Sequence, residues 1–137
     1  MTTVVKKQHF SAPADTVWEL VGDFFGLTAW MHGGARVDRN GDERIRTVTM
    51  HDGAQIVERL LGEGAHFHHY RFDDPGPVPV RDFTARFTVI DSGPEQSEIE
   101  WTATFEPAPG VPEEAVVAAV GGLYQASLEN IAAVLAG

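Results

Sequence analysis

The sequence predicts an α+β protein in which a curved antiparallel sheet of about seven strands wraps around a long C-terminal helix, with two short helices after the first strand. Three observations predict this fold. A short β-like segment comes first, strictly alternating apolar and polar residues fill the middle, and an apolar stripe at helical spacing comes last. An antiparallel sheet with one apolar face must cover that face, and only the last helix is long enough to do so.

The first quarter of the chain predicts one strand and two short helices. Residues 4–10, VVKKQHF, have the composition of a short strand, and residues 15–24 predict a helix after Pro13. The next residues, up to Arg36, combine aromatic side chains with glycines and predict a second short helix and a loop. Its large apolar side chains form either a lid over a cavity or a plug at the end of the sheet: Phe24, Leu27, Trp30 and Met31.

Residues 36–105 predict the rest of the sheet. In TARFTVI and SEIEWTATF, apolar residues alternate with polar ones, which indicates antiparallel strands with one solvated face. Residues 91–96, DSGPEQ, predict the turn between these two strands. Residues 73–80, DDPGPVPV, predict a proline-rich connection, because proline cannot donate the hydrogen bonds of a central strand.

The long helix begins after a strong start signal. Pro112 is followed by Glu113 and Glu114, whose carboxylates favour the positive end of the helix dipole, and the pattern continues to about Leu135. Two glycines, 121–122, interrupt the helix at a cost of about 1 kcal/mol each relative to alanine. Small residues there indicate a bend, close packing or a ligand cavity beneath the helix.

Composition limits the partners. The 137 residues fit one domain, residues 1–137, and a net charge of −10 opposes binding to nucleic acid. No apolar run is long enough to insert into a membrane and the first residues lack a signal-peptide core, so we expect a cytoplasmic protein. The chain has no cysteine, which excludes thiolate chemistry. A small-molecule or protein partner remains, and the oligomeric state stays open.

The hairpin at residues 45–61, IRTVTMHDGAQIVERLL, contains the most informative charges of the chain. A two-residue turn at 52–53 places Arg46 and Glu58 on opposite faces of the sheet, whereas a three-residue loop at 51–53 places them directly opposite each other. We predict the three-residue loop, with its glycine in the left-handed conformation.

In that register the pair lies on a face that is otherwise apolar, with Val48, Met50, Ala54, Ile56 and Leu60. A pair on such a face is desolvated, which shifts pKa values and fixes geometry, and it can serve as a general acid/base with an orienting cation. The alternative is a solvated cross-strand pair that contributes about 0.2–1 kcal/mol to stability.

The following hairpin raises the same question for histidine. If residues 62–64 form its loop, Glu58 faces His68, and Tyr70 shares that face. A histidine beside a carboxylate can relay protons near neutral pH, while the alternative is a histidine on a partly solvated strand. His66 and His68 share a strand face, but two histidines at this spacing indicate a metal only weakly, and we expect no metal.

The order of elements and several motifs resemble the START/SRPBCC superfamily, which has the helix-grip fold. The resemblance is closest to its polyketide cyclase/dehydrase subgroup, which includes lachrymatory factor synthase-type proteins. The motifs are FFGLTAW, IRTVTM, ERLL, HYRF, PVPVRDF, IEWTATFEP and LYQASLENI. The resemblance implies a small hydrophobic ligand in a cavity between the sheet and the long helix, and no cofactor.

The resemblance also implies site residues. Arg46 matches the cavity arginine of the family, Glu58 its acid/base carboxylate and Tyr70 its cavity tyrosine, and these are the candidate catalytic residues. Phe83 stands where the family usually has tyrosine, so one hydroxyl is missing. The candidate ligand contacts are Leu27, Trp30, Val48, Ile56, His68, Phe83, Trp101 and Tyr124.

Two functions follow as hypotheses. In the first, the protein binds a small carbonyl, aromatic or polyketide-like compound and catalyses its cyclisation, dehydration or isomerisation by acid/base chemistry. In the second, it is a non-catalytic carrier or sensor of a hydrophobic ligand. The sequence contains no G-x-S-x-G, Walker or dinucleotide-binding glycine motif, so hydrolysis by a nucleophilic serine, phosphoryl transfer and NAD binding have no sequence support.

Overall fold

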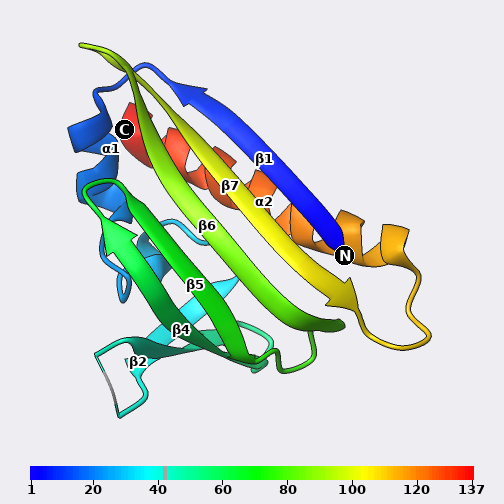
Figure 1. Ribbon diagram of the computed structural model, residues 1–137. Helices are drawn as coiled ribbons and strands as arrows, with labels where there is room; N and C mark the ends of the chain where they lie inside the picture. The colour runs from blue at the N-terminus through cyan, green and yellow to red at the C-terminus, as the bar shows by residue number, and fades with distance from the viewer. Residues whose placement is uncertain (42) are drawn as a thin grey trace.

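The computed structural model describes residues 1–41 and 43–137. Its seven antiparallel strands form one curved sheet in the order β1-β7-β6-β5-β4-β3-β2 (Figure 1). The strands are β1 (Thr2–Phe10), β2 (Gly34–Arg39), β3 (Ile45–Met50), β4 (Gln55–Gly64), β5 (Phe67–Asp74), β6 (Val80–Gly93) and β7 (Gln96–Pro107). The helices are α1 (Ala14–Val21), the single 3-10 turn η1 (Leu27–Ala29) and α2 (Glu113–Ala136).

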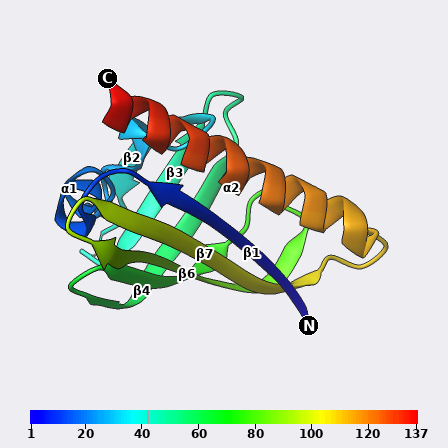
Figure 2. The same ribbon diagram turned by 90° about the horizontal axis from the view of Figure 1, so that it is seen from above.

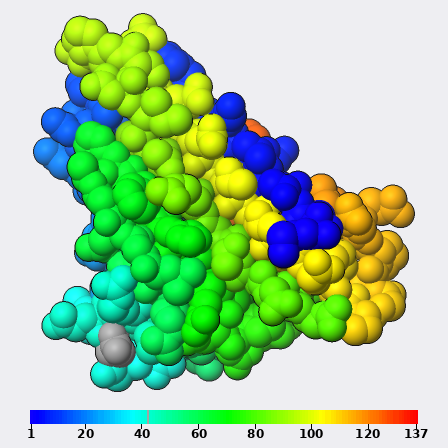
Figure 3. Space-filling view, in the orientation of Figure 1, coloured from blue at the N-terminus to red at the C-terminus, as the bar shows by residue number. Residues whose placement is uncertain are grey.

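Helix α2 covers the concave face of the sheet, as Figure 2 shows from above. The opposite face carries the outward side chains of the strands, and α2 is largely hidden behind it in Figure 3. Along β7 every second residue is buried, including Ile99, Trp101 and Phe105, as the alternation predicted. The predicted fold class is therefore confirmed, and the core lies between sheet and helix.

The second predicted helix is wrong in extent. Only the 3-10 turn η1 forms, because the glycines and aromatic residues around it provide no amphipathic period. Two hydrogen bonds attach the segment after η1 to α2. The backbone N–H of His32 donates to Ser127 Oγ at 3.0 Å, and Asn130 Nδ2 donates to the Trp30 carbonyl at 3.2 Å. These contacts hold Trp30 beneath the helix.

Of the three explanations for the glycine pair in α2, close packing fits Gly121. A Cβ at Gly121 would lie 3.2 Å from Lys6 Cε and 3.8 Å from Val4 Cγ1, so the missing side chain lets the helix approach β1. A Cβ at Gly122 would meet no atom within 4 Å. The two neighbouring glycines therefore have different roles.

The first hairpin has the predicted three-residue loop. Arg46 pairs with Glu58 across β3 and β4, and the Gly53 N–H donates to the Met50 carbonyl at 2.9 Å. Gly53 has φ +90°, in the region that favours glycine. The loop thereby places Arg46 and Glu58 on the same, concave face.

The predicted register of the second hairpin is wrong. Strand β4 continues to Gly64, and Glu58 pairs with Phe72 instead of His68. The register shifts by one residue between the Leu60 and Gly62 pairs of β4. Beyond this bulge the odd-numbered residues of β4, and no longer the even-numbered ones, share the inward face of the sheet. His68 is therefore still on the inward face and buried, although its strand partner is Glu63.

Candidate functional site

The site is centred on a buried ion pair. Arg46 Nε and Nη2 both donate to Glu58 Oε1, at 2.9 and 2.5 Å, and each side chain is about 5% exposed. Glu58 Oε2 receives no hydrogen bond from a residue that the structure describes. One carboxylate oxygen is thus held by the guanidinium, and the other is available to a ligand.

Arg46 is fixed from two further directions. Its Nη1 donates to the Phe24 carbonyl at 2.5 Å, and its Cζ lies 3.8 Å from the centroid of the Phe24 ring. The Tyr70 ring is 5.2 Å from the same atom. Such cation–π contacts favour a charged guanidinium in a place that is poor in water. The loop before η1 therefore completes the arginine site that the strands begin.

Three aromatic residues continue the site toward α2. Trp101 Nε1 donates to the Tyr70 hydroxyl at 3.1 Å, and the Trp101 ring stacks on Tyr124 at a centroid distance of 3.7 Å. The Tyr124 oxygen is buried near the Tyr70 hydroxyl, without a well-oriented hydrogen bond to a described residue. Burial, and then the Glu58 charge, raise the pKa of Tyr70, so its hydroxyl stays protonated and can donate.

His68 lies next to this cluster in an apolar setting. Its ring packs against Trp18 and Phe24 at centroid distances of 5.0 and 5.6 Å. Burial, and then the charge of Arg46, lower the pKa of His68 from 6.5 to about 4. The ring is therefore neutral at neutral pH. No hydrogen bond joins it to Glu58 in the described part of the chain, so the predicted proton relay has no direct path.

The side chains enclose a mostly apolar cavity of about 50 Å³ between the sheet and α2. Its lining comprises Leu27, Met31, Arg46, Ile56, Glu58, Tyr70, Phe72, Val78, Phe83, Trp101, Val120, Leu123 and Tyr124. An engineered protein cavity that binds benzene measures about 150 Å³. An aromatic ligand therefore requires this cavity to widen.

The structure brings most of the predicted residues to this cavity, with three exceptions. Trp30 and His68 line a smaller space of about 10 Å³ behind Arg46. The indole N–H of Trp30 is buried there without a partner among the described residues. Val48 lines neither space, because it is fully buried between its strand partners Val37 and Ile56.

Sequence reasoning missed some of the lining. Phe72 follows Tyr70 at the two-residue spacing of one strand face, so the alternation in HYRF was a usable signal. Val78 had no such signal, because it lies in the proline-rich loop between β5 and β6.

No group of three or more His, Asp or Glu side chains in residues 1–41 and 43–137 could hold a metal ion. His66, one member of the predicted weak histidine pair, hydrogen bonds instead to Asp15 at 2.9 Å. Among the described helices, none is both long and apolar enough to cross a membrane.

Comparison with known families identifies the chain. Residues 1–136 match the family described as "Polyketide cyclase / dehydrase and lipid transport". The protein belongs to this family. The match spans every strand and helix described above, so the predicted resemblance is confirmed at the level of family and fold. No curated protein matches the chain.

Solved structures show how widely this family shares its fold. An uncharacterized protein of Bacillus thuringiensis has a TM-score of 0.93 at 23% identity, with 99% of this chain and 100% of that chain covered. A START superfamily protein of Mycobacterium smegmatis has a TM-score of 0.79 at 16% identity, covering 96% and 94%. Norcoclaurine synthase of Thalictrum flavum, in complex with dopamine and hydroxybenzaldehyde, has a TM-score of 0.72 at 13% identity, covering 98% and 86%.

Proposed function

We propose that this member of the polyketide cyclase/dehydrase family binds a small hydrophobic carbonyl compound in the inner cavity and moves a proton of that compound through Glu58. The observation that carries the proposal is the asymmetry of the ion pair. Arg46 holds Oε1 of Glu58, and Oε2 has no partner among the described residues while the side chain lines the cavity. A fixed carboxylate with one unused oxygen is arranged as a general base.

Arg46 has donors left for a second task. A guanidinium carries five N–H groups, and three of them are used by Glu58 and the Phe24 carbonyl. The remaining two can stabilise an oxyanion that forms on the ligand when the base removes a proton. Both side chains line the cavity, so acid/base and charge-stabilising groups face the same space.

Tyr70 supplies the orienting contact in this proposal. Its hydroxyl accepts a hydrogen bond from Trp101, and its own proton can be donated to the neighbouring Tyr124 oxygen or to a ligand oxygen. Its raised pKa keeps that proton in place, so Tyr70 acts as a donor and not as a base. Proton removal next to a carbonyl is the step that cyclisation, dehydration and isomerisation of such compounds have in common.

The size of the cavity determines which test ligands are used. Because about 50 Å³ suits a compound smaller than benzene, the test uses a series of methyl ketones, from acetone to acetophenone. Binding is followed by chemical shifts of the protein, and the exchange of ketone α-protons for deuterium is followed by ¹H NMR in D₂O. Glu58→Gln keeps the shape of the side chain and removes the base. Asp91→Asn, which neutralises an exposed carboxylate near the C-terminal end of β6, is the matched control.

Wild-type protein and Asp91→Asn should accelerate α-proton exchange, and Glu58→Gln should bind the same ketone without accelerating it. If all three proteins bind a ketone and none accelerates exchange, the acid/base assignment is wrong and the protein acts as a carrier or sensor. If no member of the series binds, the carbonyl ligand class is wrong.

A further inference from the structure

The sheet divides at one end, between β5 and β6. These strands pair only from Phe67–Thr88 to Arg71–Thr84, and no pair joins them beyond Arg71. There β5 remains bonded to β4, and the beginning of β6 remains bonded to β7. The sheet is therefore interrupted where it covers the inner cavity.

An unusual backbone conformation lies beside this division. Asp82 has φ +52°, the only positive φ of a non-glycine residue in the described chain. It lies in the part of β6 where the pairing with β7 shifts, between Arg81 and Thr84. A non-glycine residue in the left-handed region costs about 1 kcal/mol or more, and such strain is often found at functional sites. Phe83, which directly follows Asp82, is buried and lies at the opening.

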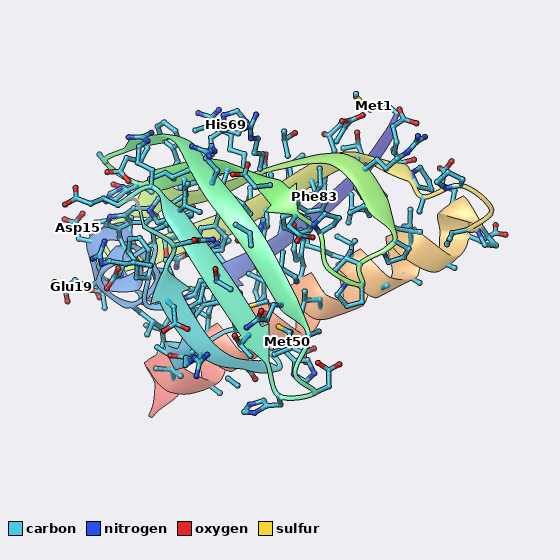
Figure 4. All side chains as sticks on the ribbon, turned by 90° about the horizontal axis from the view of Figure 1, so that it is seen from below. Met1, Asp15, Glu19, Met50, His69 and Phe83 are labelled. Carbon is cyan, nitrogen blue, oxygen red and sulfur yellow. The ribbon has the colours of Figure 1, made fainter. Side chains whose placement is uncertain are left out.

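Two aromatic rings close the opening. Phe72 from β5 and Phe83 from β6 stack across it, with a centroid distance of 3.8 Å and an interplanar angle of 13°. Figure 4 shows Phe83 in the space between the end of β5 and the beginning of β6. No backbone hydrogen bond has to break for these rings to separate, because the strands are not paired there.

The same two rings line two spaces. On the inside they belong to the cavity of about 50 Å³ that holds the Arg46–Glu58 pair. On the outside they form the floor of an open pocket of about 700 Å³. The rim of the outer pocket is formed by Arg71, Asp73, Pro75, Val80, Arg81, Asp82 and Thr84. Only the stacked rings are common to the two linings.

We propose that small molecules reach the inner cavity through the sheet, with the outer pocket as the entry site and the Phe72–Phe83 stack as its gate. The outer pocket fits an amphipathic compound, because its floor is aromatic and its rim is charged. Separation of the rings also widens the inner cavity, which is too small for an aromatic ligand with the gate closed. This inference extends the proposed ligand binding, and its test uses no natural ligand.

A competing route runs between the loop after η1 and α2. Met31 and Leu123 line the cavity on that side and are only half-buried. Both routes lead to Trp101, which lines the cavity and is 4% exposed. Quenching of Trp101 fluorescence by acrylamide, a small neutral molecule, therefore reports on either route. Trp18→Phe and Trp30→Phe remove the other tryptophans.

Because the chain has no cysteine, single cysteines can be labelled selectively. Thr84→Cys places a bulky, non-fluorescent maleimide in the outer pocket, and Thr88→Cys places the same label on the same strand face outside that pocket. Leu123→Cys places it in the competing route. The quenching rate constant of Trp101 is measured before and after labelling, and circular dichroism verifies that each variant is folded.

Label at Thr84→Cys should lower the quenching rate constant several-fold, and label at Thr88→Cys should leave it unchanged. Phe72→Ala, which removes half of the gate, should raise it several-fold without any label. The gate is refuted if label at Leu123→Cys blocks quenching while label at Thr84→Cys does not, or if Phe72→Ala folds and leaves the rate unchanged. These outcomes are independent of ketone binding and α-proton exchange, so the gate and the proposed function can fail separately.

Discussion

Arg46 donates two hydrogen bonds to a single oxygen of Glu58, Oε1, inside the concave face of the sheet. A bidentate pair that used both carboxylate oxygens would place a guanidinium N–H in front of each oxygen and leave neither oxygen fully open to a ligand. In the observed geometry the positive charge of Arg46 compensates the negative charge of Glu58, and Oε2 remains unused. The same contact therefore stabilises the buried carboxylate and leaves one of its oxygens open to a ligand.

Removing only one partner of the Arg46–Glu58 pair should destabilise the protein. Arg46→Met leaves the Glu58 carboxylate buried without its cation, and we expect the free energy of unfolding to fall by about 3 kcal/mol or more. The double variant Arg46→Met/Glu58→Leu removes both charges and should recover a large part of that loss. Urea denaturation of the three proteins measures both effects. A double variant as unstable as Arg46→Met would show that the loss comes from packing and not from the unpaired charge.

His68 should make the protein sensitive to acid. Its pKa is lowered to about 4 in the folded protein, so the unfolded chain, with a pKa near 6.5, takes up the proton more readily. The stability that His68 contributes is complete above pH 6.5 and is lost as the pH falls from 6.5 toward 4. Over this range the loss is on the order of 3 kcal/mol.

The variant His68→Gln isolates this effect, because glutamine does not titrate. Neighbouring groups, such as Asp23, Arg46 and the Asp15–His66 pair, remain in both proteins and contribute the same background. Unfolding free energies measured between pH 7 and pH 4 should fall less steeply in the variant than in the wild type. Parallel curves would mean that His68 is not buried in its neutral form.

The two glycines of α2 should respond in opposite directions. Gly122 is exposed and a Cβ there meets nothing, so Gly122→Ala should stabilise the protein by about 0.5–1 kcal/mol through helix propensity. Gly121→Val should destabilise it, because the branched side chain would push α2 away from Val4 and Lys6 of β1. Thermal unfolding of both variants compares them directly. Equal stabilisation of both would contradict close packing at Gly121.

The features that could be predicted from the sequence are those that depend on the two-residue alternation of side chains along a strand. Alternation assigned the inward faces of β6 and β7. In the first hairpin the Asp52–Gly53 sequence left two turn lengths open, and the resemblance of Arg46 and Glu58 to a cavity pair of the family favoured the three-residue loop that the structure has. That register brings Arg46 and Glu58 together. The pattern of the last helix was equally informative. Its length and apolar stripe showed that it covers the sheet, because no other predicted element is long enough to do so.

What the sequence could not predict depends on local irregularities. The second hairpin turns at residues 65–66, beyond the 62–64 segment that the glycines indicated, and a bulge between the Leu60 and Gly62 pairs shifts its register by one further residue. A glycine such as Gly62 fits a bulge as well as a turn, so it does not distinguish the two. The left-handed conformation at position 82, beside the division of the sheet, has no glycine to mark it, because the residue there is Asp82. The size of the cavity depends on how closely α2 approaches the sheet, and that distance is the sum of many side-chain contacts.

The ligand site beside Arg46 and Glu58 is tested most directly by whether a small ketone binds inside the cavity. Methyl NMR signals of Leu27, Ile56 and Leu123, which line it, should shift when the ketone is added to the wild type. Val120→Trp, which fills the cavity, should abolish these shifts, and Val134→Trp, on an exposed turn of α2, should preserve them. Shifts that persist unchanged in Val120→Trp, or that appear only at surface methyls, would contradict a ligand site beside Arg46 and Glu58.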